Sequence, residues 1–82
     1  MSKQDVFDIV IRHCYEVLPE LEGHEFKPGE SLTDLGANSI DRAEIVTLTL
    51  ESLSLHMPRV ALAGINTIDG LVDTLYRKLQ SA

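Results

Sequence analysis

The stretch DLGANSID, residues 34–41, marks the point at which a long loop gives way to a helix. Asn38 is a favourable N-cap residue, because its side-chain oxygen can accept a hydrogen bond from a first-turn backbone N–H. Asp41 stands at the third helical position, where a carboxylate can complete a capping box. The pattern therefore predicts a helix over residues 39–53, which ends at the break formed by residues 54–58.

Further helices are predicted on both sides of this one. Residues 3–18 carry apolar side chains at helical spacing, and Pro19 ends them because proline disfavours helix in the residue before it. Thr67 is the N-cap of a last helix, whose apolar face continues to Leu79. A short apolar segment, residues 60–65, is predicted as a brief helix. Since no segment alternates for long enough to form a strand, the fold class is all-α: a small four-helix bundle with three longer helices and one short third helix.

The stretch between the first two helices, residues 19–38, lacks helical periodicity and is acidic. Because apolar residues recur along it, we expect a long loop that packs over the core. The expected apolar anchors of this loop are Leu21, Phe26, Leu32 and Leu35. The expected inward-facing side chains of the following helix are Ile40, Ala43, Val46, Leu50 and Leu53.

The composition is that of one folded domain spanning residues 1–82. Hydrophobic residues make up 44% of the chain and charged residues 24%, which excludes a disordered tail. A net charge of −6 argues against nucleic acids and anionic membranes as partners. The single cysteine, Cys14, excludes an internal disulfide and fits the cytoplasm, and no signal peptide or membrane span is recognisable.

Several kinds of catalytic or metal site are excluded by spacing. The soft metal ligands are His13, His24, His56 and Cys14, and none has the spacing of a zinc site. His13 and Cys14 lie on an apolar helical face, so we expect both to be packing residues. No base and acid can be assigned to Ser39 for a hydrolytic triad. The sequence therefore predicts that the protein is not an enzyme.

Acidic charge is concentrated around one hydroxyl group, that of Ser39. Residues 16–51 contain nine acidic and two basic residues, a local charge of −7. In the first turn of the helix, Ser39 would lie at the positive end of the helix dipole, where an attached phosphate is favoured. Serine is also an ordinary first-turn residue, and composition alone does not decide between these interpretations.

The stretch of residues 34–41 resembles the phosphopantetheine attachment motif of acyl carrier proteins, which usually reads Leu-Gly-x-Asp-Ser-Leu-Asp. The resemblance implies that Ser39 carries 4′-phosphopantetheine, delivered from coenzyme A by a magnesium-dependent phosphopantetheinyl transferase. The thiol of this arm then holds an acyl group as a thioester. The acidic residues that would face basic partner enzymes are Asp34, Asp41, Glu44 and Glu51.

The chain also departs from the usual carrier pattern. Asn38 and Ile40 replace Asp and Leu, Arg42 follows Asp41, and Arg59 stands where fatty-acid carriers tend to be acidic. These departures, together with the run ESLSLHMPR at residues 51–59, make the chain similar to freestanding donor carriers of polyketide β-branching cassettes.

This narrower resemblance implies an acetyl donor for an HMG-CoA-synthase-like enzyme, one related to 3-hydroxy-3-methylglutaryl-CoA synthase. It also implies an acyl-loading enzyme, a monomeric carrier, and a docking face that includes Arg42 and Arg59. The alternatives are a generic fatty-acid, polyketide or aminoacyl carrier, and an unmodified helical interaction module.

Overall fold

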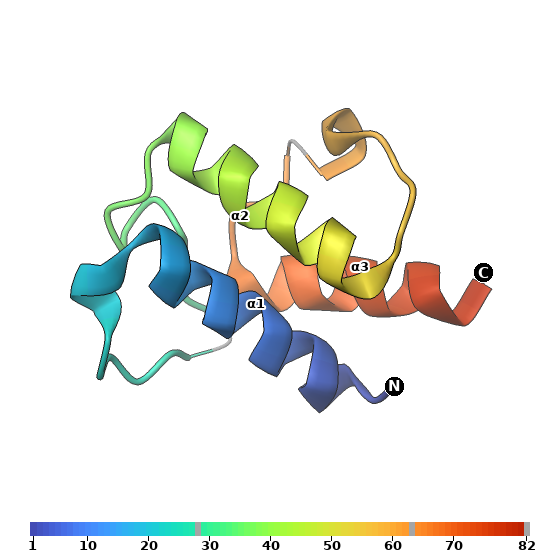
Figure 1. The fold of residues 1–82 in the computed structure, drawn as a ribbon, viewed down its shortest axis with the longest axis horizontal. Coiled ribbons are helices and arrows are strands. Elements are labelled where there is room, and N and C mark those ends of the chain that lie inside the picture. Colours follow the sequence, from blue (N-terminus) through green and yellow to red (C-terminus); the bar gives the residue numbers. More distant parts are fainter. Residues whose placement is uncertain (28, 63, 82) are drawn as a thin grey trace.

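The computed structural model describes residues 1–27, 29–62 and 64–81, without the side chains at positions 59 and 60. Three α helices form the frame: α1 (Lys3–Val17), α2 (Ser39–Leu53) and α3 (Ile68–Ser81), shown in Figure 1. Among the described residues there is no strand, only one isolated antiparallel bridge between Ser31 and Thr67. The all-α prediction is confirmed.

The predicted count of four helices is not confirmed. The segment expected to form a short helix over residues 60–65 is the 3₁₀ turn η2 (Arg59–Leu62), and position 63 lies outside the described residues. The backbone N–H of Ala61 donates to the Pro58 carbonyl at 3.0 Å, a bond between residues three apart. A stretch this short cannot recover the cost of nucleating an α helix, so the tighter turn forms instead.

Helix α1 begins and ends close to its predicted bounds. Ser2 is the N-cap, and its hydroxyl accepts a hydrogen bond from the Asp5 N–H while the Asp5 carboxylate accepts one from the Ser2 N–H. Leu18 closes the helix, and Pro19 starts the 3₁₀ turn η1 (Pro19–Leu21). The chain therefore leaves α1 where the proline predicts.

The predicted inward face of α2 is partly wrong. Ile40 is 75% exposed, whereas Ile45, which the predicted stripe omits, is fully buried beside Thr49. Thr49 can face the core because its hydroxyl donates to the Ile45 carbonyl at 2.7 Å and is thereby satisfied. Apolar residues occur on several sides of α2, so periodicity in the sequence does not select one face.

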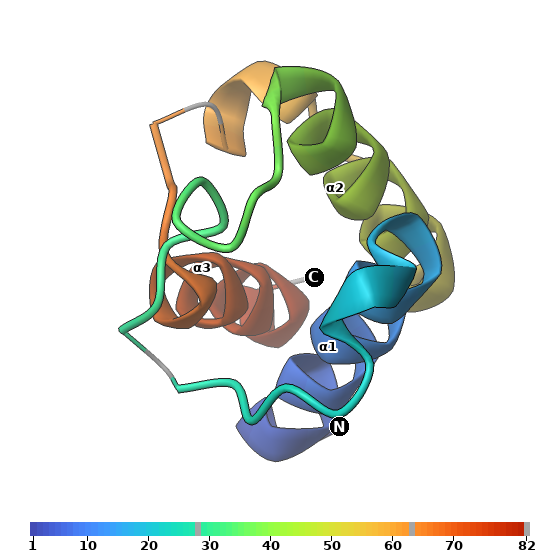
Figure 2. The same ribbon diagram turned by 90° about the vertical axis from the view of Figure 1, so that its left-hand side faces the viewer.

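The core lies where the three helices meet. Helix α1 contacts both α2 and α3, and the two views in Figures 1 and 2 show the helices arranged around a common centre. No helix in the described part of the chain is long and apolar enough to cross a membrane. The buried apolar residues are Val6, Val10, Cys14, Leu18, Leu32, Ala37, Ile45, Leu50, Leu53, Leu62, Ile68, Leu71, Val72 and Leu75.

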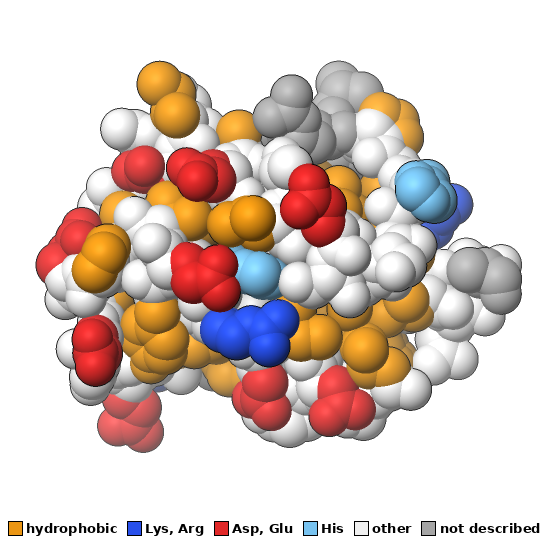
Figure 3. Space-filling view, in the orientation of Figure 1, with side chains coloured by type: hydrophobic (Ala, Val, Ile, Leu, Met, Phe, Trp, Pro, Cys, Tyr) orange, Lys and Arg blue, Asp and Glu red, His pale blue; other side chains and the backbone are white. Residues whose placement is uncertain are grey.

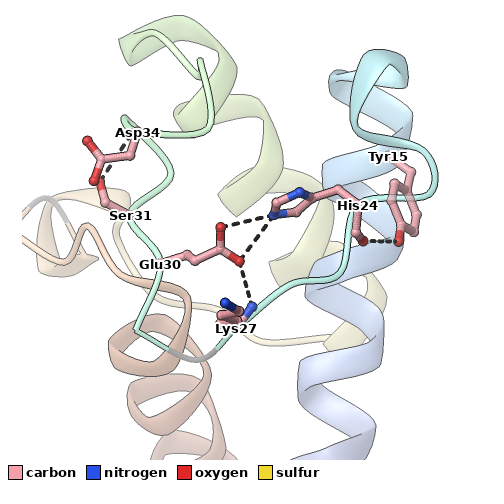
Figure 4. Close-up of polar contacts among 6 residues, drawn as sticks. All are labelled: Tyr15, His24, Lys27, Glu30, Ser31 and Asp34. Atoms are coloured by element: carbon pink, nitrogen blue, oxygen red, sulfur yellow. Dashed lines mark hydrogen bonds and ion pairs between the residues drawn. The ribbon is translucent and has the colours of Figure 1, made fainter.

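Polar contacts hold the first half of the long loop against α1 (Figure 4). The Glu30 carboxylate contacts the His24 ring at 2.9 Å and accepts a hydrogen bond from the Lys27 N–H at 2.6 Å. The Lys27 N–H, with a further contribution from His24, holds the pKa of Glu30 below its usual 4.5. Tyr15 of α1 donates to the His24 carbonyl, and its ring packs edge-on against Phe26. The loop is therefore fixed where it leaves α1.

The second half of the loop packs against the segment before α3. Leu32 and Ala37 are each only 2% exposed, and the Leu32 N–H donates to the Asn66 carbonyl at 3.0 Å. Gly36 turns the chain with a φ of 98°, a conformation that side chains disfavour. These contacts fix the path of the loop up to the start of α2. The expectation of a loop packed over the core is thus confirmed.

Candidate functional site

The Ser39 hydroxyl stands on the first residue of α2, at the end of the packed loop. Its side chain is exposed. The residue before it, Asn38, is the N-cap, and its side-chain oxygen accepts a hydrogen bond from the Asp41 N–H at 2.8 Å. The Asp41 carboxylate accepts in return from the Asn38 N–H at 3.2 Å. The capping box predicted from the sequence is confirmed, and it fixes the position of Ser39.

This end of α2 fits a phosphate attached to Ser39. The first N–H groups of a helix lack partners within the helix and carry the positive end of its dipole. The capping box occupies the N–H of Asp41, and the N–H groups of Ser39 and Ile40 precede it in the same first turn. An exposed hydroxyl at this place is accessible to a separate enzyme, and a phosphodiester on it would remain in solvent.

The predicted acidic docking residues lie on the loop before this serine and along α2 after it. Asp34, Glu44 and Glu51 are exposed, and Asp41 is half-buried in the capping box. Residues spaced by three and seven lie on one face of a helix, so the three acidic residues of α2 form a single stripe. Figure 3 shows acidic side chains over α2, and further ones spread across the rest of this face.

The two arginines of the predicted docking face differ in what the structure describes. The side chain of Arg59 lies outside the described residues. The Arg42 guanidinium, which is half-buried, donates to the Thr33 hydroxyl at 2.7 Å and to the Ala37 carbonyl at 3.2 Å. Nothing in the sequence signals these contacts, because Thr33 precedes Arg42 by nine residues across an irregular loop.

Sequence reasoning also missed the exposure of Ile40, the residue that follows Ser39. Its side chain is 75% exposed and therefore adds an apolar contact surface to an otherwise polar end of the helix. The sequence offers no cue for this exposure, because α2 carries apolar residues on more than one side. The site thus presents a hydroxyl, an apolar side chain and a stripe of carboxylates together.

The remaining candidate ligands lie away from this site. His13 and Cys14 are buried at 5% and 0% exposure, which confirms the expectation that both are packing residues. The His13 ring contacts the Ser52 hydroxyl of α2 at 2.7 Å, so it also joins two helices. Burial raises the pKa of the Cys14 thiol to about 11, and the thiol stays protonated and unreactive near neutral pH. Within the described residues, no three side chains of His, Cys, Asp or Glu gather as a metal site.

Comparison with known proteins identifies the family. Residues 9–75 match the family model described as "Phosphopantetheine attachment site". The chain is 52% identical over 82 residues to the polyketide biosynthesis acyl-carrier-protein AcpK of Bacillus subtilis strain 168, with both chains covered completely. It is 34% identical over 82 residues to an acyl carrier protein of Cyanidioschyzon merolae, with 99% of this chain and 89% of that protein covered.

A solved structure matches as well. It is the curacin biosynthetic pathway HMG synthase in complex with an acetyl donor carrier, matched with a TM-score of 0.86 and 43% identity over 92% of this chain and 96% of that chain. The chain therefore belongs to the phosphopantetheine-attachment family of acyl carrier proteins. The resemblance to carriers of polyketide biosynthesis, and with it the 4′-phosphopantetheine cofactor, is confirmed.

Proposed function

We propose that this protein carries an acetyl group on a 4′-phosphopantetheine arm linked to Ser39, and donates it to an HMG-CoA-synthase-like enzyme in polyketide β-branching. The observation that carries this proposal is the exposed hydroxyl at the capped start of α2, in a chain whose fold matches an acetyl donor carrier with a TM-score of 0.86. The 52% identity to a polyketide carrier supports the same pathway class.

The chain holds the arm in place, and separate enzymes catalyse the reactions. A magnesium-dependent phosphopantetheinyl transferase would join the Ser39 oxygen to the phosphorus on the pantetheine side of coenzyme A. The serine hydroxyl would lose its proton, the pyrophosphate bond of coenzyme A would break, and adenosine 3′,5′-bisphosphate would leave. The arm supplies a terminal thiol that bears the acetyl group as a thioester. The capping box of Asn38 and Asp41 holds the serine at the helix start, and the dipole favours the phosphate beside it. Because Cys14 is buried, its thiol does not compete for acylation.

The proposed docking face consists of Asp34, Asp41, Glu44 and Glu51, together with Arg42 and Arg59. The exposure of three of the carboxylates supports it, since exposed charges at an interface rim mainly set the association rate and its salt dependence. Exposed Ile40 adds an apolar contact at the centre.

We further infer a monomeric carrier formed by one domain over residues 1–82, loaded by a separate acyl-loading enzyme in the cytoplasm. The continuous core that joins all three helices supports one domain. The net charge of −6 supports basic protein partners over nucleic acids and anionic membranes. The turn η2 would take the place of the short third helix in the expected four-helix bundle.

The proposal is tested by competition between carriers. The chain and a fatty-acid carrier are both loaded with acetyl and offered separately to an HMG-CoA-synthase-like enzyme of a β-branching cassette. We expect acetyl to leave this chain much faster. Equal donation from both carriers would overturn the donor assignment and leave a generic acyl carrier. A chain that acquires no arm from coenzyme A and a broad-specificity transferase would favour the unmodified interaction module.

A further inference from the structure

The Arg42 side chain bends back from α2 onto the loop that precedes Ser39. It lies three residues after Ser39, and therefore next to it on the helix surface. Its guanidinium bonds to the Thr33 hydroxyl at 2.7 Å and to the carbonyl of buried Ala37 at 3.2 Å. These two bonds join the first turn of α2 to both ends of the final turn of the loop.

A chain of hydrogen bonds continues from Thr33 to the segment before α3, and each donor in it is bonded to the next acceptor. The Thr33 hydroxyl donates to the Asn66 side-chain oxygen at 3.0 Å, and the Asn66 side-chain nitrogen donates to the Ser31 hydroxyl at 2.7 Å. Arginine can only donate, so Thr33 must accept from Arg42 and give its single proton to Asn66. The direction of these bonds fixes the orientation of the Asn66 side-chain amide. The backbone carbonyl of Asn66 also accepts a hydrogen bond from the Leu32 N–H.

We propose that Arg42, Thr33, Asn66 and Ser31 form a clasp that positions Ser39 for attachment of the arm, with Arg42 as the positioning residue. This inference rests on the proposed function of Ser39. The clasp connects the start of α2, the loop turn and the segment before α3, which are distant in the sequence. Both bonds are donated by one guanidinium nitrogen, Nη1, so Arg42 can position the loop while its other nitrogens face a partner on the proposed docking face.

Two single variants separate positioning from docking. Arg42→Met removes the donor and a surface charge, whereas Thr33→Val removes the acceptor and leaves every charge in place. If the clasp positions Ser39, both variants lower the kcat/KM of the transferase, each by up to about tenfold, because a loosened loop populates the competent arrangement less. The double variant should be no slower than the slower single variant, as partners in one interaction are not additive. Arg12→Met, which removes an exposed arginine on α1, is the control for charge and should react like wild type.

Hydrogen exchange of the unmodified chain supplies a readout independent of any enzyme. The amides of Leu35, Gly36 and Ala37 bond within the loop turn, to Ser31, Thr33 and Leu32. In Arg42→Met and Thr33→Val these amides should exchange faster while the helical circular dichroism stays unchanged. Arg42→Lys, which keeps the charge but not the fork, should fall between wild type and Arg42→Met.

The outcomes are distinguishable. The inference holds if Arg42→Met and Thr33→Val both slow attachment of the arm, if the slowing of each variant is the same at low and high salt, and if the loop amides exchange faster in both. Slower attachment in Arg42→Met alone, with an effect that vanishes at high salt, would overturn it in favour of docking. The inference would also be overturned if both variants received the arm as fast as wild type. A wild type that receives no arm would instead overturn the proposed function of Ser39.

Discussion

Helices α1 and α2 both begin with a capping box, but their first residues and surroundings differ. Ser2 and Asp5 form a capping box at the start of α1, and Asn38 and Asp41 form the equivalent box at the start of α2. The α2 box follows a loop that is packed and hydrogen-bonded. At the first helical position α1 has Lys3, and α2 has Ser39.

The difference shows that a capped helix start is a structural element and not yet a site. What distinguishes the α2 start is an exposed serine hydroxyl at the first position, an exposed apolar neighbour in Ile40, and a hydrogen bond from Arg42 to the loop.

The largest expected effect comes from transplanting the serine. In a Ser39→Ala background, Lys3→Ser places a hydroxyl at the first position of the α1 capping box. We expect no gain of mass with coenzyme A and transferase, because α1 lacks the loop and neighbouring residues of α2. Attachment at position 3 would show that any capped helix start is sufficient, and the contrast between the two helices would be lost.

The next effect separates the exposed and buried faces of α2. Ile45→Ala should lower the free energy of unfolding by about 2–5 kcal/mol, because it opens a cavity in the core. Ile40→Ala should change it by less than about 0.5 kcal/mol, as for other surface substitutions. Urea unfolding of both variants measures the difference. Similar losses would mean that Ile40 is packed in the core, and would remove it from the site.

The two caps themselves should be of similar stabilising value. Asn38→Ala and Ser2→Ala should each cost about 1 kcal/mol, since each leaves a first-turn N–H without its acceptor. Only Asn38→Ala should also slow the attachment of the arm, because only that cap holds Ser39. Thermal unfolding and the transferase rate test this pair; an equal slowing by Ser2→Ala would mean that global stability governs the rate.

The smallest effect concerns the loop that distinguishes α2 from α1, and it depends on pH. The pKa of Glu30 is lowered in the fold, so its carboxylate stabilises the protein above the usual pKa of 4.5. That contribution is lost as the pH falls below 4.5 and through the lowered pKa. Glu30→Gln should therefore unfold at a lower temperature than wild type at neutral pH, and the gap should close in acid. The control is Glu25→Gln, which removes an exposed carboxylate from the same loop. A constant gap between wild type and Glu30→Gln across the pH range would contradict the prediction.

The sequence predicts best those features that depend on neighbouring residues. The α2 start follows from Asn38 and Asp41, and the end of α1 from Pro19, because caps and proline act over a few residues. Position 39 as the candidate site follows from the same local pattern together with the family motif.

The rest depends on contacts between distant residues. Ile40 was predicted to be inside and is exposed, because α2 is apolar on more than one side and only packing against α1 selects the face. The bond between Thr33 and Asn66 spans 33 residues, and no periodicity or spacing indicates it. The short helix predicted before α3 proved to be the turn η2, whose length decides its form.

The central claim is that Ser39 alone receives the arm, and peptide mapping tests it most directly. The purified chain is incubated with coenzyme A and a broad-specificity transferase, digested, and analysed by mass spectrometry. The chain has six serines, at positions 2, 31, 39, 52, 54 and 81. We predict one phosphopantetheinyl group, on the peptide that contains Ser39, and none in Ser39→Ala, which should fold like wild type. A modified Ser39→Ala chain, with the arm on Ser31, Ser52 or Ser54, would contradict the account.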